Sequence, residues 1–183
     1  MSIFLVSCGG ADHGQDQGDV NMSNLILDQD AGTRFFEGEL FTGTGIKIYP
    51  NNVKASSVQY LNGIKEGSSL KWFQDGLLSY DGRYVNGRLH GSEKSWWKNG
   101  NLRSVSQYKN GIAHGAQKEW YLSGEKFKER NIVDGLEMGM QKAWRINGKL
   151  FVNYEAKNGR NYGMRKAGMC YEVKDEKVQH DEQ

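Results

Sequence analysis

A fixed repeat of 24 residues is the feature of this sequence that most restricts its fold. Glycine recurs at that interval through five successive units with no insertion. The main series comprises Gly43, Gly67, Gly91, Gly115, Gly139 and Gly163; a second comprises Gly63, Gly87, Gly111, Gly135 and Gly159; a third comprises Gly76, Gly100, Gly124 and Gly148. A unit of this size cannot bury a core alone, so neighbouring units must stack on one another.

The glycines of the second and third series predict two hairpin turns in each unit. Those of the second series follow Asn or Asp, as in Asn86-Gly87, and those of the third follow Asp, Asn or Ser, as in Asn99-Gly100. Because Asn-Gly and Asp-Gly favour two-residue type I′ turns, we expect such turns in both series. The segments between them have the length and composition of strands. The sequence therefore predicts an all-β, elongated single-layer antiparallel meander of 24-residue hairpin repeats, with about eleven strands.

Aromatic residues follow the same period and are candidates for a core or a binding face. They are Trp72, Trp96, Trp120 and Trp144 at one repeat position, and Tyr60, Tyr84 and Tyr108 at another. We expect each tyrosine to lie between the tryptophans of neighbouring hairpins, as interior packing of the sheet. The alternative is a platform on which a carbohydrate or lipid ligand stacks. Asp81-Gly82 falls outside the turn register, and we interpret it as a bulge.

The N-terminus carries a motif for lipid attachment. The stretch Leu5-Val6-Ser7-Cys8 resembles the lipobox of bacterial lipoproteins, whose cysteine is diacylated. Seven residues precede Cys8 and none is Lys or Arg, whereas a signal segment has a basic start and a longer apolar stretch. Either the true start lies upstream, or the match is accidental and Cys8 ends an apolar strand or is a buried thiol. We expect residues 1–8 to be a remnant of a lipoprotein signal, and the polar residues 9–33 to form a flexible tether.

Composition and motifs argue against an enzyme, a metal site and a nucleic-acid partner. Lys and Arg total 24 and Asp and Glu total 22, which leaves no large basic field for phosphate. His90 and His114 share one repeat position, which favours a structural role such as a hydrogen bond at a turn edge. Nucleophile elbows, phosphate loops and HExxH zinc motifs are absent from the sequence. We predict no catalytic residue, no cofactor and no metal site.

The best-formed units resemble the bacterial variant of the membrane occupation and recognition nexus (MORN) repeat. They contain Tyr-x-Asn-Gly-x-x-His-Gly, as YVNGRLHG at 84–91 and YKNGIAHG at 108–115. Repeats are expected over residues 34–163, with a half-unit FEGELFTG before units that start at 43, 67, 91, 115 and 139, and with a cap strand and charged tail over 164–183. Departures from the motif are Glu66, Met138 and Tyr162 in place of His, Arg145 in place of an aromatic residue, and Ala156 in place of Tyr.

The resemblance implies an elongated sheet that mediates protein or membrane contacts. We therefore expect a non-enzymatic scaffold, anchored to a bacterial membrane through Cys8 and facing the periplasm or exterior. It would bind an unidentified protein or an envelope polymer along the sheet face or an edge strand. Some bacterial members are labelled antitoxin components, so the alternative is a cytoplasmic partner that neutralises a toxin protein. Cys170, in an apolar setting, is expected to be an inert buried thiol.

Overall fold

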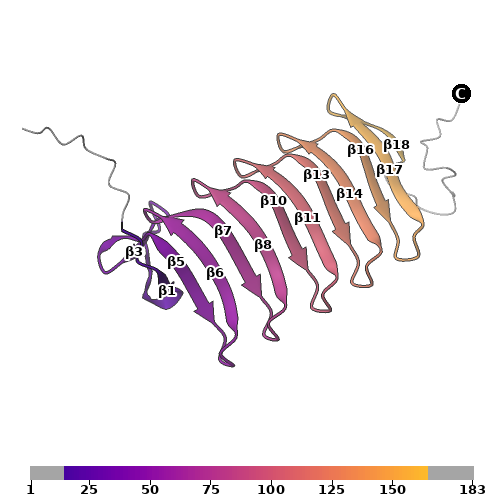
Figure 1. Ribbon diagram of the computed structural model, residues 1–183. Helices are drawn as coiled ribbons and strands as arrows, with labels where there is room; N and C mark the ends of the chain where they lie inside the picture. The colour runs from indigo at the N-terminus through magenta and orange to yellow at the C-terminus, as the bar shows by residue number, and fades with distance from the viewer. Residues whose placement is uncertain (1–14, 165–183) are drawn as a thin grey trace, which may run out of the picture.

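The computed structural model describes residues 15–164, which form an open antiparallel sheet (Figure 1). Its strands follow one another in chain order, which confirms the predicted all-β meander and its count of about eleven strands. They are β5 (Gly43–Ile48), β6 (Lys54–Leu61), β7 (Ile64–Trp72), β8 (Leu78–Val85), β10 (Gly91–Trp96), β11 (Leu102–Lys109), β13 (Gly115–Trp120), β14 (Lys126–Val133), β16 (Gly139–Trp144), β17 (Leu150–Lys157) and β18 (Arg160–Met164). The predictions for Cys8, Cys170 and the C-terminal tail lie outside the described residues.

One margin of the sheet carries the type I′ turns predicted for the second glycine series. Both central residues must have positive φ in this turn, and Asn86 and Gly87 have φ of 49° and 74°. Similar positive values recur in every unit, from Asn62-Gly63 to Asn158-Gly159. Three short strands follow these turns, β9 (Arg88–Leu89), β12 (Ile112–Ala113) and β15 (Leu136–Glu137), and each pairs back onto the strand before the turn.

The opposite margin carries a different turn, and the prediction of type I′ turns was wrong there. The Phe73 N–H donates to the Leu77 carbonyl at 2.8 Å, and the Gly76 N–H donates to the Phe73 carbonyl at 3.0 Å. Only Gly76, with φ of 87°, is left-handed. This is a three-residue loop, a type I turn closed by a left-handed residue. The dipeptide was misleading because glycine serves equally as the second residue of a type I′ turn and as the last residue of this loop.

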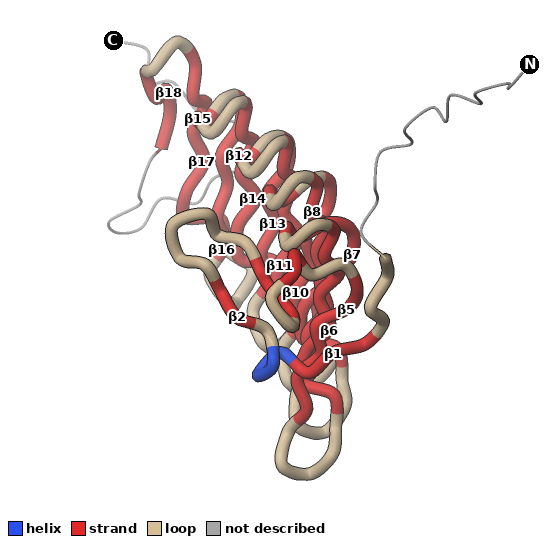
Figure 2. Tube along the Cα trace, turned by 90° about the vertical axis from the view of Figure 1, so that its left-hand side faces the viewer, coloured by secondary structure: helices blue, strands red, loops and turns tan. Residues whose placement is uncertain are grey.

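Four glycines of the main series, Gly67, Gly91, Gly115 and Gly139, each mark a bulge, whereas Gly163 lies in regular pairing. Gly91 has φ of 80° and interrupts the pairing between two strands. Before Gly91, Leu89 lies opposite Tyr84, and after it, Lys94 lies opposite Asp81. Over this stretch the later strand therefore has two residues more than its partner strand. The later strand is therefore split into β9 and β10. The bulge recurs once per unit, and Figure 2 shows the resulting hairpins stacked one behind another.

Residues 15–33 are folded, which contradicts the expected tether over this part of the chain. β1 (Asp19–Asn21) pairs in parallel with β5, and the 3-10 turn η1 (Met22–Asn24) follows it. Leu25 is 5% exposed and Phe41 is fully buried, and both pack with Tyr60. The Leu25 side chain packs against Gly45, where an added Cβ would lie only 3.1 Å from the Leu25 Cδ1 atom. The segment is a cap on the first hairpin.

The expected half-unit also belongs to this cap and not to the main sheet. Its turn at Glu37-Gly38 has positive φ at both residues, as a repeat turn does. Its strands form a separate three-stranded sheet from β2 (Ile26–Leu27), β3 (Arg34–Phe36) and β4 (Glu39–Leu40). The repeats of the main sheet therefore begin at Gly43, and the half-unit closes the N-terminal end of the stack.

Candidate functional site

The sheet has two chemically distinct faces, and the tryptophan and tyrosine columns lie on opposite ones. Tyr84 pairs with Gly67 and Tyr80 pairs with Lys71, so these side chains share one face. Trp72 follows Lys71 and points to the other. We call these the Tyr face and the Trp face, after Tyr60, Tyr84 and Tyr108 and after Trp72, Trp96, Trp120 and Trp144. The expected interleaving of the two columns was wrong because the register separates them.

On the Trp face the four tryptophans are packed to different degrees. Trp144 is 8% exposed, while Trp72, Trp96 and Trp120 are half-buried. Lysine side chains from neighbouring strands lie over the rings, with the Lys54 Nζ 6.0 Å from the Trp72 ring centre and the Lys126 Nζ 5.4 Å from that of Trp144. Lysine stems and ammonium groups therefore supply part of the packing of these rings.

A second aromatic column lies on the Tyr face, one residue after the tryptophan position of each unit, which is Ile48 in the first unit. It was not predicted as a site. Its members are Tyr49, Phe73, Trp97 and Tyr121, with Arg145 in the last unit. The Tyr49 hydroxyl donates to the Trp72 carbonyl at 2.9 Å, and the Tyr121 hydroxyl donates to the Trp144 carbonyl at 2.9 Å. The Trp97 Nε1–H donates to the Trp120 carbonyl at 3.1 Å. These three bonds each join one hairpin to the next, and Phe73 has no donor for such a bond. The 24-residue recurrence was the signal that could have found this column.

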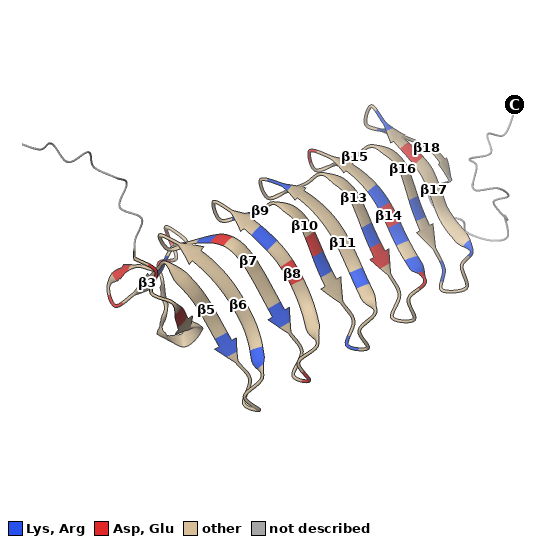
Figure 3. Cartoon of the chain, viewed as in Figure 1, with Lys and Arg blue, Asp and Glu red and all other residues tan. Residues whose placement is uncertain are grey.

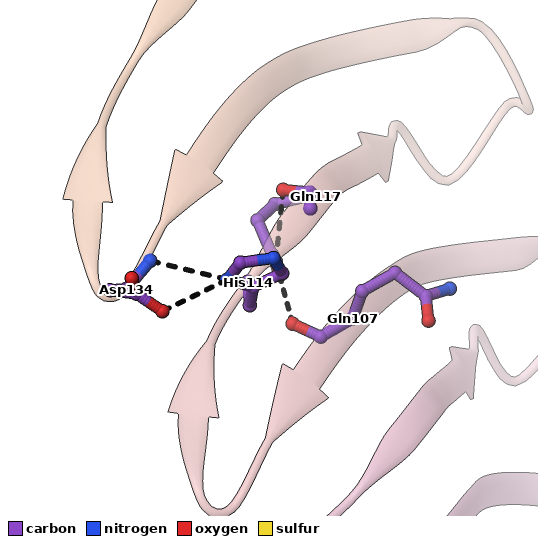
Figure 4. A network of polar contacts seen from close by, with 5 residues as sticks. Gln107, His114, Gln117 and Asp134 are labelled. Carbon is purple, nitrogen blue, oxygen red and sulfur yellow. Dashed lines mark hydrogen bonds and ion pairs between the residues drawn. The ribbon is translucent and has the colours of Figure 1, made fainter.

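The histidine position of the repeat is a turn cap, and the expected turn-edge hydrogen bond is confirmed for His114 (Figure 4). The His114 Nδ1 accepts from the Asp134 N–H at 3.3 Å and lies 3.1 Å from the Asp134 Oδ1. Glu66 holds the same position in its unit and accepts from the Asn86 N–H at 2.7 Å. An acceptor at this position caps the next turn in these units, which explains why Glu can replace His there.

A cluster of three tyrosines around Glu93 occupies the middle of the Tyr face. Burial raises the pKa of the Tyr80 hydroxyl, and its hydrogen bond to Tyr84 and the charge of Glu93 raise it further. Burial also raises the pKa of Tyr108, again reinforced by Glu93. The Tyr80 ring lies across Gly82, where an added Cβ would come within 2.5 Å of the Tyr80 Oη.

The interpretation of Asp81-Gly82 as a bulge was wrong. Gly82 pairs regularly with Ser69, and its φ lies outside the positive range. Glycine is needed here because a ring covers the backbone, and not because the chain bends.

Beside this cluster the Tyr face has a hollow of about 420 Å³. Three serines that share a face form its floor: Ser95, Ser104 and Ser106. The Ser95 and Ser104 hydroxyl oxygens are 2.6 Å apart. At two of these repeat positions both neighbouring units carry larger side chains, with Lys71 and Glu119 in place of Ser95, and Tyr80 and Lys128 in place of Ser104. The hollow exists because the unit that starts at Gly91 departs from its two neighbours at these positions.

Trp97 and Phe127 form the walls of this serine hollow, which Trp120 also lines, and the rings of Trp97 and Phe127 are both held in place. The bond to the Trp120 carbonyl fixes the Trp97 indole. The Phe127 ring packs against the Tyr121 ring, with their centres 4.8 Å apart. The aromatic surfaces are therefore positioned before any ligand arrives.

Two charged side chains line the rim of the hollow and differ in their partners. Glu119 is paired with Arg130 at 3.4 Å. The Arg103 guanidinium lies 4.8 Å from the centre of the Trp97 ring, and within residues 15–164 it makes no ion pair. Arg103 is exposed, so its guanidinium is accessible from solvent. The site thus combines hydroxyl groups, aromatic surfaces and one uncompensated guanidinium.

Other kinds of site have less support in the described part of the chain. Over residues 15–164, His, Cys, Asp and Glu side chains nowhere gather in a group of three or more that could hold a metal. No helix in that range is long and apolar enough to cross a membrane. Lys and Arg are interspersed with Asp and Glu along the strands (Figure 3), in agreement with the balanced composition.

Comparisons with known proteins leave the family open. No protein-family model matches this sequence, and no curated protein matches it significantly. Among solved structures, one chain of the Glycosylation Associate Protein (Gap123) complex from Streptococcus agalactiae is similar at 16% identity and a TM-score of 0.31. The match covers 62% of this chain and 20% of that chain. A TM-score of this size supports no inference about fold or function.

Proposed function

We propose that this protein is a non-enzymatic binding scaffold that holds a partner against the Tyr face of its sheet. The observation that carries the proposal is the serine hollow, where one unit abandons the repeat and leaves preformed aromatic walls around a polar floor. Concave, partly aromatic sites with a few polar groups are typical of binding sites. The surrounding repeats supply rigidity, since each hairpin is bonded to the next.

The proposed setting is the bacterial envelope. It depends on the lipobox-like sequence at Cys8 and on the resemblance of the units to MORN repeats, both of which stay proposals. The partner would then be a protein or an envelope polymer. The antitoxin-like alternative gains no specific support from any contact within residues 15–164.

Photo-crosslinking in cells that produce the protein tests the binding face. Ser106 and Val105 are adjacent in β11 and lie on opposite faces, so a photoreactive amino acid at each position gives a matched pair. We expect a discrete adduct from position 106 and little from position 105. Adducts from position 105 alone would contradict the proposal, because they would place the partner on the Trp face.

Metabolic labelling with a fatty acid tests the anchor independently. We expect the wild-type protein to carry the label and to fractionate with membranes, and Cys8→Ala to lose both properties. An unlabelled wild-type protein in the soluble fraction would overturn the anchor and leave the proposed binding face standing.

A further inference from the structure

We infer that the serine hollow binds a sugar residue of an acidic polysaccharide, with the sugar ring between Trp97 and Phe127 and its carboxylate on Arg103. This inference rests on the proposed function and names the class of envelope polymer that the scaffold would hold.

The hydrogen-bonding groups of the hollow suit a sugar better than a peptide. Strands β10, β11 and β13 pair with one another, so their backbone groups are already used. A peptide lying on this face would find few partners for its own N–H and C=O groups, and leaving them unpaired is costly. A sugar presents hydroxyl groups on its edges and C–H groups on its ring faces. The serine floor can bond the first, and Trp97 and Phe127 can pack against the second.

Arg103 adds a requirement for negative charge. A guanidinium binds a carboxylate through two parallel N–H bonds, and stacking on an aromatic ring holds it in the orientation to do so. The Trp97 ring provides that stacking at 4.8 Å. Arg103 is specific to this unit, because the equivalent positions are Ala55, Ser79, Phe127 and Phe151. The guanidinium and the serine floor therefore occur together only in the unit that forms the hollow.

The size and position of the hollow fit one ring of a long chain. Its volume of about 420 Å³ is at the lower end of the range of ligand sites. It lies on the face of an open sheet, so a polymer can cross it without threading an end into the protein.

Titration calorimetry on the full chain with a galacturonic acid tetramer tests the inference. We expect saturable binding with one tetramer per protein, and the methyl-esterified tetramer, which lacks the charge, to bind about tenfold more weakly. Arg103→Gln should lose a similar factor. The control is Arg83→Gln, an arginine on the Trp face of β8, which should leave the affinity unchanged.

A second pair of variants tests the hollow by filling it. Ser104→Tyr puts a tyrosine ring into the hollow, so binding should be lost. The new ring must take another orientation than that of Tyr80, because Ser106 stands where Gly82 lies under the Tyr80 ring. Ser56→Tyr places the same residue at the same repeat position two units earlier and should bind normally. Circular dichroism confirms that each variant is folded.

Three outcomes would overturn the inference. They are equal binding of the charged and esterified tetramers, normal binding by Ser104→Tyr, and tighter binding of hexaglutamate than of the tetramer with the same dependence on Arg103. The last result would make the ligand an acidic peptide. A protein adduct at position 106 without tetramer binding would also remove this inference, while the proposed scaffold would stand.

Discussion

At the scale of single residues, the glycines of the main series are required by backbone conformation, and in some units also by space. Gly67 and Gly91 have φ of 90° and 80°, which other residues adopt only with strain. An added Cβ at Gly91 would meet nothing within 4 Å, whereas one at Gly67 would overlap the Gln59 Oε1. That oxygen accepts from the Ser68 N–H at 2.6 Å, so it cannot move away without losing a bond.

This difference predicts unequal costs for the same substitution. Gly91→Ala should lower the free energy of unfolding by about 1–2 kcal/mol from the left-handed backbone alone. Gly67→Ala should cost roughly 1 kcal/mol more, because the bond to Gln59 is also lost. Urea denaturation of the two variants measures both values. Equal costs would show that Gln59 adapts freely.

The tyrosine cluster predicts a response to alkaline pH. An ordinary tyrosine has a pKa of about 10, and burial raises the pKa of Tyr80 and Tyr108 above it. Because the folded pKa is the higher one, stability should be complete below about pH 10 and should fall as the pH rises above it. Titration of tyrosinate absorbance, compared with Tyr80→Phe, follows this step.

Glu93→Gln separates the two causes of the raised values. Removing the charge should lower the pKa of Tyr80 and of Tyr108, but burial should keep both above the ordinary value. Unchanged titration curves in this variant would mean that Glu93 does not act on either hydroxyl.

At the scale of elements, three members of the second aromatic column, Tyr49, Trp97 and Tyr121, each bond one hairpin to the next. Tyr121 makes this bond through its hydroxyl, whereas Phe73 occupies the same position in another unit without one. Tyr121→Phe should therefore keep the ring packing and lose about 1 kcal/mol of stability. The reverse change, Phe73→Tyr, should add a bond to the Trp96 carbonyl and raise the melting temperature. Equal effects of the two substitutions would contradict a role for the hydroxyl.

The sequence predicted these elements where local chemistry decides them. Type I′ turns at Asn86-Gly87 and its equivalents followed from the dipeptide alone. The opposite turns, such as that ending at Gly76, were mistaken because loop length depends on strand pairing that no dipeptide encodes. The face of the sheet on which a side chain lies could not be predicted for the same reason. One extra residue in a turn decides whether Trp72 and Tyr84 lie on the same face.

The candidate site was harder to predict than the fold. The serines of the hollow have no motif, and they become visible only when units are compared position by position. Tyr84 and Tyr108 were singled out as repeat positions and Tyr80 was not, and the register was needed to place all three around Glu93. The cap was missed because residues 15–33 are mostly polar. A few apolar side chains, such as Leu25, are enough to fold this segment because they pack against Tyr60.

At the scale of the whole molecule, stability should be distributed along the array, because each repeat contacts only its neighbours. The cap core is local to the N-terminal end and contains the fully buried Phe41. Phe41→Ala should cost about 3–5 kcal/mol there. Hydrogen exchange should rise in β1 and β5 and stay unchanged in β16.

Leu136→Ala provides the control for this prediction, since Leu136 is 73% exposed and should cost less than about 0.5 kcal/mol. Uniform loss of protection along the whole sheet in Phe41→Ala would mean that the array unfolds as one cooperative unit.

Hydroxyl-radical footprinting of two adjacent tryptophans tests the central claim most directly. Trp96 lies on the Trp face and Trp97 on the wall of the serine hollow, so they report on opposite faces of one strand end. In the presence of the galacturonic acid tetramer or an envelope polymer fraction, we predict protection of Trp97 and an unchanged rate at Trp96. Protection of Trp96 with no change at Trp97 would contradict a binding site on the Tyr face.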